Sequence, residues 1–151
     1  MQLNFRKAEK SDLEKIIELL ISDKLGKTRE KTDAESLKKY TTAFDKISTD
    51  ENQFLAVLES EQKIIGTCHL TIMPSLTYVG SDRLAIEAVR IDDDYLNQGL
   101  GSWMIEQAIE FGKNRGIKIF QLTSNKKRQR AINFYKKLGF EETHEGMKLM
   151  L

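Results

Sequence analysis

The sequence predicts one α/β domain with a central sheet of mixed strand direction. Its length of 151 residues is that of a single domain with a substantial core. Apolar runs typical of strands alternate along it with segments in which apolar residues recur at helical spacing. No repeat or linker-like stretch interrupts them, and the only proline, Pro74, follows an apolar run. We therefore expect residues 1–151 to form one domain.

The first part of the chain predicts a strand, a helix and a loop. Residues 2–8 alternate apolar and polar side chains, which favours a strand. Ser11, with Glu14 three residues later, matches the capping box that begins many helices, so a helix is expected over residues 11–22. Residues 22–31 contain a glycine and charges of both signs, which is typical of a mobile loop.

A second helix and a hairpin follow. Asp33 is a candidate N-cap for a helix with an apolar stripe. The stripe consists of Leu37, Tyr40, Phe44 and Ile47. Residues 53–59 and 64–73, joined by the polar turn 60–63, predict an antiparallel hairpin.

The next three segments predict a strand-helix-strand unit. Residues 84–91 are mainly apolar on both faces, which is typical of a central strand covered on both sides. A helical period runs over residues 99–115, and Gly116 supplies its stop. Residues 117–123 read as a strand, which should run parallel to the first through a right-handed connection.

A last helix and two short strands complete the expected fold. Residues 131–138 carry apolar side chains at helical spacing, and Gly139 ends them. Short strands are expected near Phe140 and over residues 147–151. The predicted order of elements is β-α-α-β-β-β-α-β-α-β-β.

Composition excludes several classes of protein. The 24 basic and 23 acidic side chains leave a net charge of +1, which gives no general attraction to nucleic acid or acidic membranes. A single cysteine, Cys68, allows neither an internal disulfide nor a cysteine-based metal site, and two histidines make a zinc site improbable. No signal-peptide core or membrane span is present. We expect a cytoplasmic protein without metal, nucleic-acid or membrane partners.

The densest motif is the turn Tyr-Leu-Asn-Gln-Gly-Leu-Gly-Ser at residues 95–102. It lies between a strand and a helix, where free backbone N–H groups and the helix dipole favour phosphate. A dinucleotide fingerprint would need glycine where Met104 stands, and a P-loop would need a lysine that is missing. A glycine turn without a ligand is the alternative.

A second motif supports a ligand at this turn. Residues 131–140 read Ala-Ile-Asn-Phe-Tyr-Lys-Lys-Leu-Gly-Phe. With the turn and the order of elements, this segment resembles the GCN5-related N-acetyltransferases, whose members carry an Arg/Gln-x-x-Gly-x-Gly/Ala turn and an Ala-x-x-Phe-Tyr-x-x-x-Gly-Phe run. The chain also resembles a group of small bacterial members of unsettled substrate, through residues 25–30, 86–90 and 143–148. Leu96 departs from the pattern, because the family has Arg or Gln there.

The resemblance implies a mixed-sheet fold that binds acetyl-CoA as cosubstrate. The pantetheine arm would meet backbone groups of Val89 and Ile91 where two strands separate. The phosphates would meet backbone donors of the turn, with Arg128 of the basic run 126–130 nearby, although a solvated helix start is the alternative for that run. The expected cofactor-binding residues are Val89, Ile91, Asn97, Gln98, Gly99, Leu100, Gly101, Ser102, Arg128 and Tyr135.

Two residues are candidates for the chemistry of acetyl transfer to an amine, which needs a general base and a general acid. Glu87 lies mid-strand between apolar neighbours, where a low dielectric would raise its pKa, and family members often place their base on this strand. A structural ion pair with Arg83 or Arg90 is the alternative. The resemblance places Tyr135 at the coenzyme sulfur as the acid, whereas a packed ring is the alternative.

The remaining polar candidates concern the substrate. His69, Arg83 and His144 could bind the acceptor, and either histidine could assist proton transfer. Cys68 is expected to pack rather than react. Residues 22–31 and 73–83 would frame the acceptor site.

The sequence thus predicts an acetyl-CoA-dependent N-acetyltransferase that moves an acetyl group to a small-molecule amine by direct attack. The alternative is a non-catalytic acyl-CoA-binding or regulatory module on the same fold, which Leu96 would permit. A homodimer is possible, because dimers are common in the family.

Overall fold

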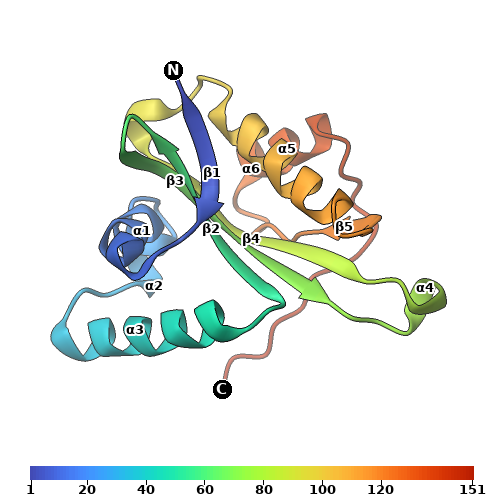
Figure 1. The fold of residues 1–151 in the computed structure, drawn as a ribbon, viewed down its shortest axis with the longest axis horizontal. Coiled ribbons are helices and arrows are strands. Elements are labelled where there is room, and N and C mark those ends of the chain that lie inside the picture. The colour runs from blue at the N-terminus through green and yellow to red at the C-terminus, as the bar shows by residue number, and fades with distance from the viewer.

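The computed structural model, which describes residues 1–151, has a five-stranded sheet in the order β1-β2-β3-β4-β5 (Figure 1). The strands are β1 (Leu3–Lys7), β2 (Gln53–Ser60), β3 (Lys63–Met73), β4 (Arg83–Ile91) and β5 (Ile119–Gln121). The first three pairings are antiparallel, whereas β4 and β5 are parallel. The mixed sheet and the parallel unit predicted from the sequence are therefore confirmed.

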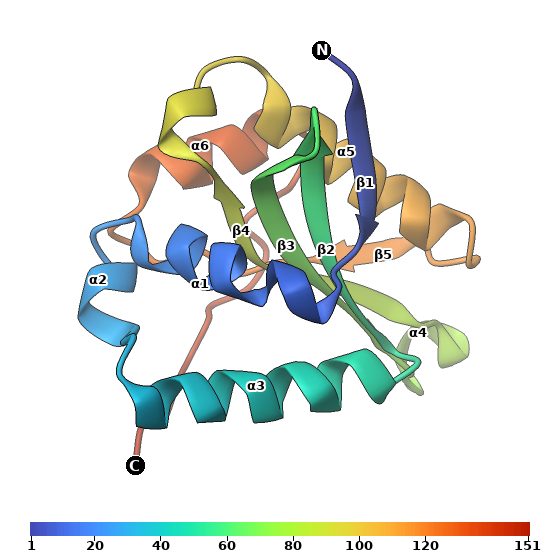
Figure 2. The ribbon, with the colours of Figure 1, turned by 60° about the vertical axis from the view of Figure 1, so that its left-hand side comes forward.

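Helices cover both faces of this sheet. The helices are α1 (Leu13–Ile21), α2 (Gly26–Arg29), α3 (Ala34–Thr49), α4 (Thr77–Gly80), α5 (Leu100–Lys113) and α6 (Gln129–Lys137), with 3-10 turns at Lys10–Asp12 and Asp93–Tyr95. Figure 2 shows α1 and α3 on one face and α5 and α6 on the other. No helix has both the length and the apolar character needed to cross a bilayer.

The two faces bury separate apolar cores. The larger one joins the sheet to α5 and includes Leu84, Ile86 and Met104 among its fully buried side chains. The smaller one joins β2 to α1 and α3 through Val57, Ile16 and Phe44. At about 25 cal/mol per Å² of buried apolar surface, burial of this kind is the main favourable term in folding.

Local capping confirms one predicted helix start and corrects another. The Asp33 carboxylate accepts a hydrogen bond from the Ser36 N–H at 2.9 Å, so it caps α3 as predicted. The predicted start at Ser11 is wrong, because a 3-10 turn from Lys10 precedes α1. There Asp12 accepts from the Glu9 N–H at 2.8 Å. Glu9 is the N-cap of this turn, and Asp12, which also accepts from Arg6, completes its capping box.

The segment 22–31 also differs from the prediction of a loop. It contains the single turn of α2, and Gly26 is buried against α1. A Cβ at Gly26 would lie 1.8 Å from the Leu20 carbonyl oxygen, so only glycine fits this contact. The segment is therefore packed on the domain rather than free in solvent.

The two closing strands predicted near Phe140 and over residues 147–151 do not form. The Phe140 ring packs edge-on against Tyr135, with centroids 6.0 Å apart. The chain then leaves the sheet, and Figure 1 shows its end extending away from the strands. A strand needs a sheet edge for its N–H and C=O groups, and none receives this segment. Its apolar side chains are exposed as a result, namely Met147, Leu149, Met150 and Leu151.

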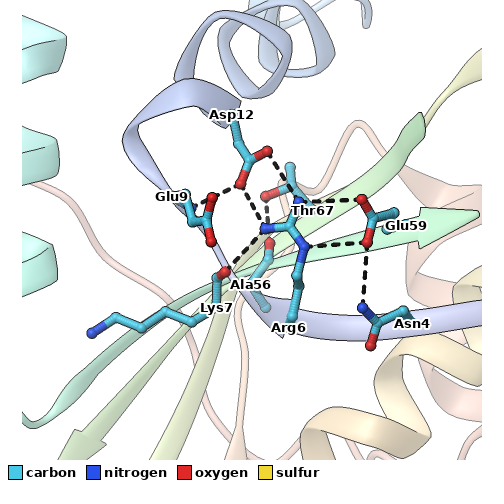
Figure 3. A network of polar contacts seen from close by, with 8 residues as sticks. All are labelled: Asn4, Arg6, Lys7, Glu9, Asp12, Ala56, Glu59 and Thr67. Atoms are coloured by element: carbon cyan, nitrogen blue, oxygen red, sulfur yellow. Dashed lines mark hydrogen bonds and ion pairs between the residues drawn. The ribbon is translucent and has the colours of Figure 1, made fainter. Parts of the chain in front are cut away.

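A polar network fastens β1 to the start of α1 and to β2 (Figure 3). The Arg6 guanidinium donates to both carboxylate oxygens of Asp12, at 2.8 and 3.2 Å, and its Nε donates to Glu59 at 3.2 Å. The hydrogen bonds from Arg6 lower the pKa of Asp12, whose side chain is only 10% exposed. Charge-assisted contacts of this kind are stronger when they are partly shielded from water.

We predict that Asp12→Asn lowers the free energy of unfolding by about 1–3 kcal/mol at pH 7. Because the folded state depresses the pKa of Asp12, its contribution is present above the unfolded value of about 3.9 and disappears as the pH falls through the folded value. Urea unfolding at several pH values should show the variant and wild type converging below about pH 4. Asp45→Asn, which breaks an exposed pair with Lys10, should cost less than about 1 kcal/mol. Equal costs for the two variants would contradict the prediction.

Candidate functional site

The edge of β4 beside β5 is paired over a short distance only. The parallel ladder joins Arg83 to Ile119, Leu84 to Phe120 and Ala85 to Gln121, and then ends. From Ile86 to Ile91 this edge of β4 has no strand partner. Unpaired backbone groups at a sheet edge can bind an extended ligand as an added strand would. β4 thus has an unpaired edge at Val89 and Ile91, where the resemblance predicts that two strands separate.

A β-bulge changes the direction of β4 along this unpaired stretch. Ala88 has a φ of 51°, and the register between β3 and β4 shifts between Thr67 and His69. One extra residue reverses the alternation of side chains that follows it. Val89 and Ile91 therefore pack on the same core as Ile86, and Arg90 turns to the opposite face.

The glycine turn offers a run of free backbone donors. Gly99, with φ 77°, is the N-cap of α5, and Asn97 also lies in the left-handed region at φ 61°. None of the N–H groups from Asn97 to Ser102 donates to a protein acceptor. Consecutive unpaired N–H groups at a helix start form a site for an anion. The donors predicted at Asn97, Gln98, Gly99, Leu100, Gly101 and Ser102 are thus free.

The two glycines of this turn have different surroundings. A Cβ at Gly99 would meet nothing within 4 Å, so this position faces open space. A Cβ at Gly101 would lie 3.3 Å from the Phe134 ring of α6. Gly99 therefore permits approach from outside, whereas Gly101 permits close packing of α5 on α6.

A basic side chain reaches the turn from α6. Leu96 is 41% exposed and has no group that could bind a phosphate. The Arg130 guanidinium instead donates to the Asn97 side-chain oxygen. Arg128, the residue expected here, forms an ion pair with Asp23 at 2.6 Å. Both arginines belong to one basic run, and the sequence carried no signal to tell them apart, because their directions depend on where α6 begins.

Tyr135 lies in an apolar and cationic environment. Its ring packs against Phe134 and Phe140, with centroid distances of 5.1 and 6.0 Å. Burial raises the pKa of Tyr135, and the charges of Arg90 and Arg128 act against that rise. A tyrosine with a raised pKa keeps its proton at neutral pH. The nearby charges of Arg90 and Arg128 would stabilise its phenolate, and both properties suit a general acid.

Glu87 differs from the prediction in its surroundings. It is exposed, so the low-dielectric environment expected from its apolar neighbours is absent. Covering on both sides holds only for the first half of β4, where Ala85 is buried on one face and Leu84 and Ile86 on the other. The alternative ion pair is absent too, because Arg83 donates to Gln121 at 3.3 Å and Arg90 pairs with Asp23 at 3.2 Å.

His69 is the direct cross-strand neighbour of Glu87. Its Nε2 lies 2.6 Å from the Gln53 side-chain oxygen. Burial lowers the pKa of His69, and the Glu87 charge opposes this effect. The structure therefore brings two of the predicted polar residues, Glu87 and His69, together on one face of the sheet.

The other candidates lie apart from this pair. Arg83 is at the start of β4, where β5 is still paired. His144 is exposed in the C-terminal segment, and its Nδ1 contacts the Thr143 hydroxyl at 2.6 Å. Cys68 is buried, and burial raises its pKa to about 12, so its thiol packs as predicted. No three or more His, Cys, Asp or Glu side chains are grouped to hold a metal ion.

Comparison with known proteins shows the family of this chain. The model of the Acetyltransferase (GNAT) family matches residues 13–140, and the chain belongs to this family. Glucosamine 6-phosphate N-acetyltransferase of Trypanosoma brucei brucei is 34% identical over 89 residues, which cover 59% of this chain and 58% of that protein. An N-acetyltransferase of Methanocaldococcus jannaschii is 42% identical over 57 residues, 38% of this chain and 25% of that protein. The chain thus matches less than two thirds of each of these relatives.

Solved structures show the same fold over nearly the whole chain. A transcriptional regulator from Bacillus halodurans is 39% identical, with a TM-score of 0.95 over 99% of this chain and 100% of that one. A predicted acetyltransferase from Clostridium acetobutylicum, determined with acetyl-CoA, is 20% identical, with a TM-score of 0.75 over 99% of this chain and 96% of that one. The second likeness concerns the fold alone.

Proposed function

We propose that this protein is an acetyl-CoA-dependent N-acetyltransferase that transfers an acetyl group to the amine of a small molecule by direct attack. Membership of the acetyltransferase family supports the reaction class. The observation that carries the proposal is the run of unpaired N–H groups from Asn97 to Ser102 beside the unpaired edge of β4. The unpaired N–H groups suit a diphosphate, and the unpaired strand edge suits an extended arm that contains amides. Coenzyme A has both a diphosphate and such an arm.

Cofactor binding would use backbone more than side chains. The N–H groups of the turn would hold the diphosphate, and backbone groups of Val89 and Ile91 would pair with the pantetheine arm. Arg130 would supply the positive charge that Leu96 cannot. Arg128 at the cofactor phosphates remains an untested prediction, and its pairing with Asp23 favours Arg130 for that role.

Acetyl transfer requires the acceptor amine to lose a proton and the coenzyme sulfur to gain one. Glu87 would accept the amine proton, directly or through water, because it is exposed on the face that carries His69. Tyr135 would donate its proton to the departing thiolate, with Arg90 and Arg128 stabilising the resulting phenolate. Cys68 takes no part, because a buried thiol with a raised pKa is a poor nucleophile.

A non-catalytic acyl-CoA-binding module is the second candidate, and the exposed Leu96 favours it. Such a module would bind acetyl-CoA without releasing coenzyme A to any amine. Homodimerisation also stays a proposal. The exposed apolar side chains of residues 147–151 are a surface that a second copy could cover.

The acceptor differs among relatives. The trypanosomal relative acts on glucosamine 6-phosphate, and a relative in Escherichia coli acts on an alanine of ribosomal protein bS18. We assign acceptor selection to residues 22–31 and 73–83, which border β4 at opposite ends of the sheet.

The first prediction from the proposed function concerns the glycine turn at residues 95–102. Gly99→Val places a branched side chain in the open space that the diphosphate would enter, so acetyl-CoA affinity measured by calorimetry should fall at least about tenfold. Gly116→Val is the matched control, because Gly116 has a φ of 75° and also meets nothing within 4 Å. Both variants should lose similar stability, about 1–2 kcal/mol, and only the first should lose affinity. Normal binding by folded Gly99→Val would place the cofactor elsewhere.

The second prediction concerns the general acid. Tyr135→Phe keeps the packed ring and removes the proton donor, so kcat for coenzyme release should fall about 100-fold or more. Acetyl-CoA affinity should change little. Stopped-flow detection of the free thiol would measure the step, and a rate equal to wild type would remove Tyr135 from this role.

The third prediction concerns the general base. Glu87→Gln should lower kcat about 100-fold and leave acetyl-CoA affinity unchanged, because the amide keeps its size and cannot take a proton. Glu106→Gln, at an exposed position on α5, is the control with the same change of charge. If the two variants turn over equally fast, His69 becomes the next candidate for the base.

A further inference from the structure

Two arginines from distant elements converge on one carboxylate. Asp23, in the segment between α1 and α2, lies 3.2 Å from Arg90 on β4 and 2.6 Å from Arg128 at the start of α6. Both contacts are to the same oxygen, Oδ2. The arginine side chains are 15% and 25% exposed, so the group is largely shielded from solvent.

Most of the donors in this group have no protein acceptor. Each guanidinium has five N–H donors. Arg90 donates one of its terminal N–H groups to the Val89 carbonyl at 2.8 Å, and its Nε has no hydrogen-bond partner. Arg128 contacts only Asp23, as an ion pair. Two guanidinium groups paired to a single carboxylate oxygen therefore keep unused donors for a carboxylate or phosphate, which would accept two hydrogen bonds from each.

The charges around Asp23 do not balance. Burial lowers the pKa of Arg90, the charge of Asp23 opposes this effect, and repulsion from Arg128 and from the exposed Arg29 adds to it. Arg90 and Arg128 give two positive charges against the one carboxylate of Asp23, which leaves an excess of one. Shielded cations in excess favour an anion.

The position of the group assigns it to the acceptor side of the site. Arg90 directly follows Val89 on the unpaired part of β4, on the face opposite the core, and both arginines act on the pKa of Tyr135. The carboxylate partner comes from residues 22–31, the segment assigned above to acceptor selection. Arg130, two residues after Arg128, points instead to the glycine turn. The basic run is thus divided between two places.

We propose that the acceptor is an amine that also carries an anionic group, a carboxylate or a phosphate, bound between Arg90 and Arg128. This inference rests on the proposed acetyltransferase function. Asp23 is the internal anion that holds the two arginines in place when no acceptor is bound. The acceptor's anionic group competes with Asp23, and its amine is thereby oriented toward the acetyl group.

The test compares amines that differ only in the anionic group: phosphoethanolamine against ethanolamine, and glycine against glycinamide. Wild type should prefer the anionic member of at least one pair by about 10- to 100-fold in kcat/KM, the effect of one or two charge-assisted hydrogen bonds. Arg90→Met and Arg128→Met should abolish that preference through KM. Because both arginines would also stabilise the Tyr135 phenolate, kcat should fall by the same factor for both members of each pair. Lys39→Met, which removes an exposed cation on α3, should keep it.

Asp23→Asn should change KM in the direction opposite to the arginine variants. The variant loses the internal competitor, so KM for the anionic amine should fall relative to wild type while KM for the neutral amine stays the same. Arg90→Lys is the variant to use if Arg90→Met does not fold, and it should retain part of the preference because the charge remains.

Two measurements separate this inference from the proposed function. Acetyl-CoA affinity of each variant should match wild type, and loss of that affinity with an unchanged preference would overturn the inference by assigning the arginines to the cofactor. Thermal protection by phosphoethanolamine, with ethanolamine as control, tests the anion site without any turnover. If phosphoethanolamine protects wild type and does not protect Arg128→Met, the anion site is supported even when no amine is acetylated. A lack of acetylation would then contradict only the proposed function. Equal kcat/KM within both pairs, with no protection, would overturn the inference alone.

Discussion

The backbone hydrogen bonds between β4 and β5 stop after three residue pairs, and the site depends on that interruption. A fully paired parallel sheet would satisfy the backbone of Val89 and Ile91 and leave no edge for a ligand. The bulge at Ala88 turns β4 at this point, and the glycine turn follows from its far end. The unpaired edge and the free N–H groups of the turn therefore belong to one continuous stretch of backbone. Helices α5 and α6 keep this arrangement rigid by packing on the core below it.

Cationic side chains divide the site into two parts. Arg130 is directed to the turn where a diphosphate would bind, whereas Arg128 and Arg90 are held by Asp23 beside the segment between α1 and α2. Residues 128 and 130 can serve different ligands because Arg128 is the N-cap that precedes α6, with non-helical backbone angles, whereas Arg130 lies in the first turn of the helix. Tyr135 lies more than one helical turn beyond both arginines along α6. A domain with a net charge of +1 can thus hold a locally strong positive potential.

Most of the fold follows from hydrophobic periodicity, and the errors have identifiable physical causes. The helix of residues 34–49, the hairpin and the parallel unit were predicted because their apolar patterns are regular. The strand predicted over residues 147–151 has such a pattern too, but pairing depends on an available sheet edge, which periodicity does not report. The left-handed Asn97 and the glycine donors could be read from the turn motif, because few residues tolerate those angles. The sequence could not predict which of Arg128 and Arg130 reaches the turn, because that depends on tertiary contacts.

The surroundings of Glu87 and its neighbours were mispredicted because strict alternation was assumed along β4. Because Ala88 is the extra residue of a bulge, Val89 and Ile91 lie with Leu84 and Ile86 on the side of the larger core. Arg90 lies on the same side as Glu87. The number of residues in β4 therefore matters more for the direction of its side chains than the identity of each residue. In the evolution of such a chain, loss or gain of a single codon near position 88 would exchange the sides of Val89, Arg90 and Ile91 together. Conservative substitutions there can accumulate one at a time, whereas a change in length must be compensated within the same strand to survive.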